Sequence, residues 1–340
     1  MSAISFSVVN AFTSRPFGGN PAVVCVLNVS PLGIRPRNFH FLHSSALIPT
    51  ARPLTRPLQT PADEPSDESK QKLAAEFNLS ETAFPIPLAA GESPRTAKRW
   101  NLRWFTPANE VPLCGHATLA TAHAIFSEGE REACRSKETS RSFTHYYGCF
   151  LRPFQSEDVG GMSKQITSVM IPEGTKVNAF AYSPESKKLL VVLDPTTTWY
   201  SFFLLIKGLI LLVSAQLMQL EARSADLLRV NPTAEIVRGL AVGFAPHDAK
   251  AQGFANDFDY VLRYFSPWNG IPEDPATGSA QCLAAPVFGR LLGKKKLKAF
   301  QSFPGRGAEF FVDLECDEKR LKISGQAVTM FHGQIDSKIL

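Results

Sequence analysis

The chain has 340 residues, of which 44% are apolar and 20% are charged. These proportions are those of globular proteins and exclude a wholly disordered, collagen-like or coiled-coil chain, and the length corresponds to about two domains. The formal charge is +5, but the single dense basic run (Lys294, Lys295, Lys296 and Lys298) is typical of a solvated loop, so we expect no nucleic-acid partner.

The cysteine pattern and the first residues indicate an intracellular protein. The six cysteines form no C-x-x-C pair and are too sparse for a disulfide scaffold, which favours a reducing compartment. At the N-terminus, Ile4, Phe6 and Val8 alternate with small polar residues, which predicts a strand and not a signal peptide. We therefore expect a cytoplasmic location and no membrane partner.

The next elements are a long insert, a helix and a strand. Residues 31–65 are rich in Pro, Arg, Ser and Thr and show no sustained period, so they predict a long loop. Leu73, Ala74 and Phe77 are spaced as on one helix face and predict an amphipathic helix from Asp67 to Asn78. Residues 79–84 alternate and predict a short strand.

An internal repeat is the most informative feature. The sequence RWFTPANEVPLCGHATLATAHA from Arg103 aligns without a gap with RYFSPWNGIPEDPATGSAQCLA from Arg263, an offset of 160 residues. Each copy predicts a strand, a turn and a helix that begins with small residues, and hence two similar halves related by a pseudo-two-fold axis. The identical pairs are Arg103/Arg263, Phe105/Phe265, Pro107/Pro267, Asn109/Asn269, Pro112/Pro272 and Ala120/Ala280.

Three further strands are predicted after the second copy, at 308–316, 320–324 and 327–335. The fold class is therefore α+β, with two pseudo-symmetric domains, each a curved, mostly antiparallel sheet around a central helix. We expect the first domain at 1–150, with the last strand (about 327–338) returning to it, and the second at 151–326.

Residues 199–214 form an apolar run that Lys207 interrupts at its centre. The run has three interpretations: a membrane span, for which it is short and wrongly charged; a buried core helix; or a segment foreign to the fold. The segment 198–216, like 31–65 and 139–161, fits the rest of the chain poorly, and translated introns are one hypothesis that covers all three.

Two junctions between a turn and a helix carry the candidate chemistry. Cys114, Gly115 and His116 begin one helix; Asp274, Gly278 and Ser279 precede or begin the other. Each junction offers unpaired N–H groups to a carboxylate. Taken alone, Asp274 followed by Pro275 is also typical of ordinary capping, His116 of a satisfied half-buried histidine, and Glu81 of a surface carboxylate.

Neither a metal site nor a nucleotide cofactor is expected. His116 and His123 are seven residues apart with no further ligand at the right spacing, and no H-E-x-x-H occurs. The glycine-rich nucleotide motifs G-x-G-x-x-G and G-x-x-x-x-G-K-[ST] are also missing from the sequence. We therefore expect chemistry without a cofactor.

Four segments in the same order resemble the phenazine-biosynthesis PhzF-like family, whose fold is that of diaminopimelate epimerase. They are NAFTSRPFGGNPAVV, LSETAF, LRWFTPANEVPLCGHATLATAHA and YFSPWNGIPEDPATGSA. The resemblance implies two domains with an active site between them, a homodimer, and a cofactor-independent isomerase that moves a proton between carbons. In the characterised branch the substrate is a dihydro-hydroxyanthranilate, so a small carboxylate is the expected substrate here.

The resemblance also implies roles for six residues. Glu81 matches the family's general acid/base, a role that needs a carboxyl group in a dry site. Gly115 and His116 match substrate-binding positions on the first half. Asp274, Gly278 and Ser279 match those on the second half.

Two alternative functions remain open. The two-base racemases and epimerases of the fold that this resemblance implies use a cysteine from each half, but the gapless repeat aligns Cys114 with Asp274, which disfavours such a reaction. A catalytically idle protein on the same scaffold would bind a ligand or regulate a partner. Glu81 discriminates this idle protein from the isomerase, because a binding protein has no need of a general base beside His116 and Asp274.

Overall fold

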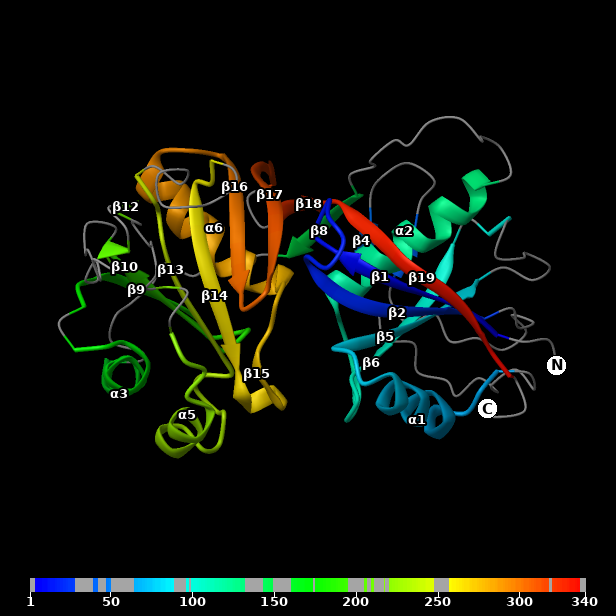
Figure 1. The fold of residues 1–340 in the computed structure, drawn as a ribbon, viewed down its shortest axis with the longest axis horizontal. Coiled ribbons are helices and arrows are strands. Elements are labelled where there is room, and N and C mark those ends of the chain that lie inside the picture. Colours follow the sequence, from blue (N-terminus) through cyan, green and yellow to red (C-terminus); the bar gives the residue numbers. More distant parts are fainter. Residues whose placement is uncertain are drawn as a thin grey trace. The chain divides into compact units, whose positions relative to one another are not determined.

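The computed structural model describes residues 4–27, 39–41, 47–49, 64–88, 96–97, 99–131, 143–148, 160–173, 175–194, 205–206, 209–210, 217, 220–247, 257–317 and 320–336. The chain divides into two compact units (Figure 1). Unit 1 comprises Met1–Tyr146 and Ser324–Leu340, and unit 2 comprises Tyr147–Ile323. The sequence predicts the boundary between the domains at 150/151, and the structure places it at 146/147.

Unit 1 is built on a six-stranded sheet in the order β19-β1-β2-β5-β6-β7. Its β2–β5 pair is parallel, and the other pairs are antiparallel. Consecutive strands pair antiparallel at β1–β2, β5–β6 and β6–β7, while β19 returns from the far end of the chain. The strands are β1 (Ile4–Ala11), β2 (Asn20–Val26), β5 (Glu81–Pro87), β6 (Trp100–Phe105), β7 (Glu110–Val111) and β19 (Ala327–Ile335).

Helix α1 (Asp67–Phe77) covers one face of this sheet, and its ends agree with its sequence. The Ser66 side chain caps the first turn by accepting a hydrogen bond from the Ser69 N–H (3.0 Å), and Asn78 ends the helix in the left-handed conformation. Leu73 and Ala74 pack into the same apolar cluster as Val8 of β1. The predicted helix from Asp67 to Asn78 is thus confirmed.

Helix α2 (Gly115–Arg131) contacts β1, β2, β5 and β19. Its buried side chains are mostly small, such as Ala117, Ala120 and Ala124, and small side chains let a helix approach a sheet closely. Figure 1 shows α2 against these strands, with α1 beside β5 and β6.

The main sheet of unit 2 has the order β18-β17-β16-β14-β13-β10-β9, and β15 pairs with β14 outside this path. Its β10–β13 and β14–β16 pairs are parallel. The strands are β9 (Val177–Ser183), β10 (Lys188–Leu193), β13 (Gly239–Phe244), β14 (Tyr260–Ser266), β15 (Ile271–Glu273), β16 (Lys296–Phe303), β17 (Arg306–Asp317) and β18 (Arg320–Gly325).

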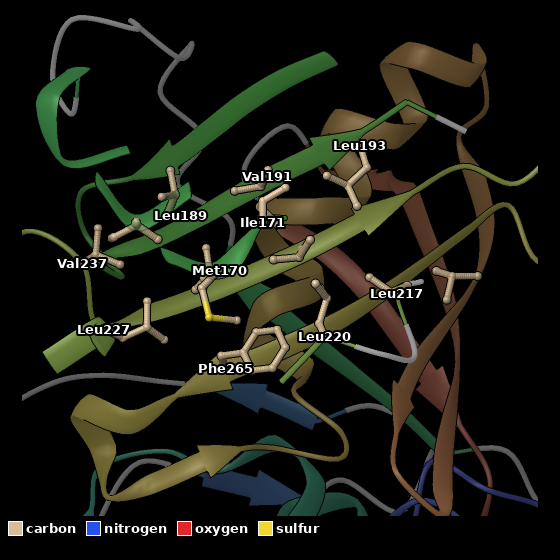
Figure 2. Close-up of a cluster of buried hydrophobic side chains, with 14 of the residues drawn as sticks. Met170, Ile171, Leu189, Val191, Leu193, Leu217, Leu220, Leu227, Val237 and Phe265 are labelled. Atoms are coloured by element: carbon tan, nitrogen blue, oxygen red, sulfur yellow. The ribbon is translucent and has the colours of Figure 1, made fainter. Parts of the chain in front are cut away.

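An apolar cluster on one face of this sheet forms a core of unit 2 (Figure 2). Alternate residues of β10, namely Leu189, Val191 and Leu193, contribute to it, as the period of two in a strand requires. Helices α3 (Gly160–Met170) and α5 (Ser224–Val230) supply further members, among them Met170 and Leu227. Helix α6 (Gly278–Leu292) contacts β9, β10, β16 and β17.

The chain passes between the two units within two strands. The first crossing lies in β8 (Phe143–Gly148) and the second in β18, as the unit bounds show. The last three strands, β17, β18 and β19, confirm the three predicted at the C-terminal end, and the α+β class is also confirmed.

The segments 31–65, 139–161 and 198–216 lie largely outside the described residues. Their described parts include two pairs of short strands, β3 (Phe39–Phe41) with β4 (Leu47–Pro49) and β11 (Leu205–Ile206) with β12 (Leu209–Ile210). At the end of the first segment, Glu64 forms an ion pair with Lys70 of α1, so this residue belongs to the packed structure of unit 1. Within the described ranges, no helix is long and apolar enough to cross a membrane.

Candidate functional site

Unit 1 places three of the predicted site residues close in the fold. Glu81 is the first residue of β5 and only 7% exposed, and Gly115 and His116 begin α2. Ser80, the neighbour of Glu81, lies 3.2 Å from the His116 ring through its Oγ and Nε2 atoms. This contact links the start of β5 to the start of α2. We call Ser80, Glu81, Cys114, Gly115 and His116 the unit 1 junction.

The hydrogen bonds of Ser80 define the protonation of His116. The Ser80 hydroxyl donates its one proton to Asn20 Oδ1 (2.7 Å) or to the carbonyl of Pro21 (3.0 Å), so it accepts from His116. Nε2 of His116 therefore carries the hydrogen. Its Nδ1 then accepts from the Cys114 thiol, whose sulfur is 3.2 Å away.

His116 is held as the neutral imidazole. Burial lowers its pKa to about 3, because a desolvated ring disfavours the charged form. Both ring nitrogens have partners inside unit 1, so the ring is fixed in one orientation. A neutral, oriented imidazole can donate or accept a hydrogen bond, but it supplies no positive charge near neutral pH.

Unit 2 holds the other three predicted residues where β15 leads into α6. The Asp274 N–H donates to the Tyr264 carbonyl (3.0 Å), which ties the residue to β14. The Thr277 hydroxyl donates to Asp274 Oδ2. Gly278 and Ser279 are the first two residues of α6, and the backbone N–H groups of a helix's first turn have no acceptor within that helix. We call Asp274, Thr277, Gly278, Ser279 and Gln301 the unit 2 junction.

Gln301 of β16 holds this junction together, and no pattern in the amino-acid sequence points to that role. Its side chain is fully buried. Its Oε1 accepts from the Thr277 N–H (2.9 Å), and its Nε2 donates to the Asp274 carbonyl (2.6 Å). A second buried glutamine, Gln281, reaches the same Oε1 (3.4 Å) and accepts from the Tyr260 hydroxyl (2.7 Å). The turn before α6 is therefore fixed through both of its ends.

An ion pair between a buried arginine and a glutamate precedes the helix in each unit. Arg103 of β6 forms two parallel hydrogen bonds with Glu110 of β7 (2.9 and 2.8 Å). Arg263 of β14 does the same with Glu273 of β15 (2.6 Å each). Each guanidinium also lies over the phenylalanine two residues further on. Such bidentate pairs fix the geometry of a hairpin.

These pairs correct the gapless alignment of the repeat. Glu110 pairs opposite Phe105 in the strand register, and Glu273 pairs opposite Phe265. Gly115 and Gly278, which begin the helices, are 163 residues apart, three more than the strands. The 3₁₀ helix η1 (Pro267–Asn269) lies in the second hairpin, where the additional residues fall. The partner of Cys114 in the repeat is thus Thr277, and not Asp274.

Among the described residues, no three His, Cys, Asp or Glu side chains gather in a way that could hold a metal ion. The polar residues at the two junctions are instead hydroxyls, amides, carboxylates and one neutral imidazole. Such groups can bind a polar organic molecule and move a proton.

Fold and junctions together define a class of pseudo-symmetric α+β proteins with polar side chains at the start of a long helix in each half. The family model described as "Phenazine biosynthesis-like protein" matches residues 58–333. The chain therefore belongs to the phenazine biosynthesis-like family.

Relatives match over nearly the full length. A Bos taurus phenazine biosynthesis-like domain-containing protein is 32% identical, covering 96% of this chain and 97% of its own. A Pseudomonas aeruginosa protein named as an uncharacterized isomerase is 31% identical, covering 98% of each. A crystal structure of a PhzF-family protein from Enterococcus faecalis superposes with a TM-score of 0.62 at 23% identity, covering 98% of this chain and 99% of that one, which shows a shared fold.

Proposed function

We propose that this protein is a cofactor-independent isomerase that moves a proton between two carbons of a small carboxylate-bearing metabolite. Family membership and the isomerase names of bacterial relatives support the general class. The buried carboxyl group of Glu81 is the observation that carries the proposal, because general bases that act on carbon need a site poor in water.

In this mechanism Glu81 is the only group that carries the substrate proton. The carboxylate takes a proton from one carbon, and the electron pair of that C–H bond moves into the adjacent unsaturated system. The protonated Glu81 then returns the proton at the other end of that system. No net charge is gained, and no oxidant or reductant is needed.

The remaining site residues orient the substrate. The N–H groups of Gly278 and Ser279 receive its carboxylate at the start of α6, where the helix dipole favours an anion. Asp274 binds a donor group of the substrate. Gly115 provides backbone contact in unit 1, while His116, tied to Ser80 and Cys114, keeps the start of α2 in place.

Solvent deuterium incorporation tests this proposal. The full chain is incubated in D₂O with a panel of unsaturated carboxylic acids that includes a dihydro-hydroxyanthranilate, and products are read by NMR. We expect deuterium at carbon for at least one acid, and its loss by about a thousandfold in Glu81→Gln, since this change removes the general base.

Glu76→Gln is the matched control, because Glu76 is an exposed carboxylate on α1. It should exchange at the wild-type rate. If Glu81→Gln exchanges as fast as this control, the proposed role of Glu81 is wrong. If acids bind the wild type but none exchanges, the alternative of a catalytically idle binding protein is favoured.

A further inference from the structure

The loop between β1 and β2 lies at the end of the unit 1 sheet where Glu81 is found. Strands β2 and β5 are parallel, and Ala22 of β2 pairs in register with Glu81. Asn20, the first residue of β2, lies 2.7 Å from the Ser80 hydroxyl oxygen through its Oδ1 atom. The loop that precedes Asn20, residues 12–19, therefore extends beyond the strands beside the unit 1 junction.

A tight turn in this loop places a phenylalanine where glycine is usual. The Gly18 N–H donates to the Arg15 carbonyl (3.4 Å), and Pro16 and Phe17 are the two residues between them. Phe17 has a φ of 65°, as at the third position of a type II turn, which glycine or asparagine normally occupies. A bulky side chain in this left-handed conformation costs free energy, so it persists only where the surroundings impose it.

The rest of the loop imposes this conformation. The Thr13 hydroxyl accepts from the Arg15 N–H and donates to the Arg15 carbonyl (3.0 Å each). A Cβ atom at Gly18 would come within 2.5 Å of the Thr13 hydroxyl oxygen, and one at Gly19 within 2.1 Å of the Ala11 carbonyl oxygen. Only glycines therefore allow the chain to pass so close to itself. The turn is thus held tightly against the end of β1.

The strained side chain is exposed next to the unit 1 junction. Phe17 is 74% exposed, the largest fraction among the large apolar side chains that the structure describes. It is three residues from Asn20, so the two Cα atoms lie within about 11 Å of each other. Leu113, the neighbour of Cys114, is 43% exposed. Two exposed apolar side chains thus belong to segments that border the junction with the proposed general base.

We propose that Phe17 is a specificity-determining residue of this site, whose ring packs against an apolar part of the bound substrate. The rigid turn holds the ring in position before binding, so little freedom is lost when the contact forms. The contact with the substrate then offsets the strain of the free protein. The substrate class is narrowed to carboxylates with a sizeable apolar carbon skeleton. This inference rests on the proposed function for the place of the site, but it concerns binding alone and needs no turnover.

The test is an NMR titration of the full chain with benzoate and cyclohex-1-ene-1-carboxylate, each compared with the small acid crotonate. We expect at least one of these ring acids to bind about tenfold more tightly than crotonate, because burial of about 55 Å² more apolar surface gives this factor. Phe17→Asn and Phe17→Gly should each abolish the difference. Both variants should melt no lower than the wild type, because asparagine and glycine accept the left-handed conformation.

Phe331→Ala is the matched control, because Phe331 is an exposed phenylalanine on the edge strand β19. It should keep the preference for the ring acids. The inference is overturned if neither ring acid binds more tightly than crotonate, or if the Phe17 variants keep the preference. It is also overturned if they lose the preference and melt below the wild type, as a merely structural residue would. A preference that depends on Phe17 without deuterium exchange of any acid would refute the proposed isomerase alone.

Discussion

Replacing Gln301 by leucine should destabilise unit 2 by an amount that the structure allows us to work out. The change keeps the approximate volume but removes the acceptor of the Thr277 N–H and the donor to the Asp274 carbonyl. Asp274 is only 9% exposed, and Gln301 is fully buried. Each buried group left without a partner costs about 1–3 kcal/mol, so we expect a loss of about 2–6 kcal/mol for the two groups.

Thermal unfolding followed by circular dichroism measures this loss. For a unit of this size, each kcal/mol lowers the melting temperature by about 2–4 °C, so Gln301→Leu should melt about 4–24 °C below the wild type. Hydrogen exchange gives a local readout, since the Thr277 amide should lose its protection.

Gln165→Leu is the matched control, because Gln165 is an exposed glutamine on α3. Its effect should stay within about 0.5 kcal/mol, as is usual for surface substitutions. The reasoning fails if Gln301→Leu melts together with this control and the Thr277 amide stays protected. The turn before α6 would then be held by other contacts.

Three further predictions concern single side chains of unit 1. His116 should stay neutral, with its hydrogen on Nε2, from pH 8 down to pH 5 in ¹⁵N NMR spectra. Because the unfolded chain binds the extra proton between pH 6.5 and about 3, the free energy of unfolding should decrease as the pH is lowered through this window, by up to about 1.4 kcal/mol per pH unit. His116→Asn should flatten that slope. Glu64→Gln should lower the free energy of unfolding, measured in urea, by about 3 kcal/mol, because it leaves the fully buried Lys70 without its nearest carboxylate. Glu68→Gln, on the exposed side of α1, should change it by almost nothing. Equal effects of the two changes would contradict the role of the Glu64–Lys70 ion pair. Asn78→Gly should leave stability nearly unchanged while Asn78→Ala should cost about 1 kcal/mol, because Asn78 has a φ of 48°; a smaller loss for alanine than for glycine would contradict the cap assignment.

Much of the fold could be predicted from local patterns. The α1 helix and the last three strands follow from apolar spacing within a few residues, and the repeat revealed the two halves. The gapless alignment kept Asn109 with Asn269 and Pro112 with Pro272, although η1 shifts the second helix by three residues. Sequence identity in a turn does not record how many residues the turn needs.

The residue of unit 2 that sequence patterns missed acts through a distant partner. Gln301 contacts Asp274 across 27 residues. It lies in none of the motifs described above, and polar residues in a strand usually face solvent. The predicted roles of Glu81, Asp274, Gly278 and Ser279 remain proposals that the experiments above address.

The two strands through which the chain crosses between the units affect the order in which the protein can fold during synthesis. Strand β1 leaves the ribosome first, but its partner β19 comes last, and the two meet in the pair Ile4 and Ile335. All residues of unit 2 are synthesised before Ser324, so the unit encoded second can close its sheet before the unit encoded first. Until translation ends, β1 presents an open edge rich in apolar residues, which is a site for aggregation of the nascent chain.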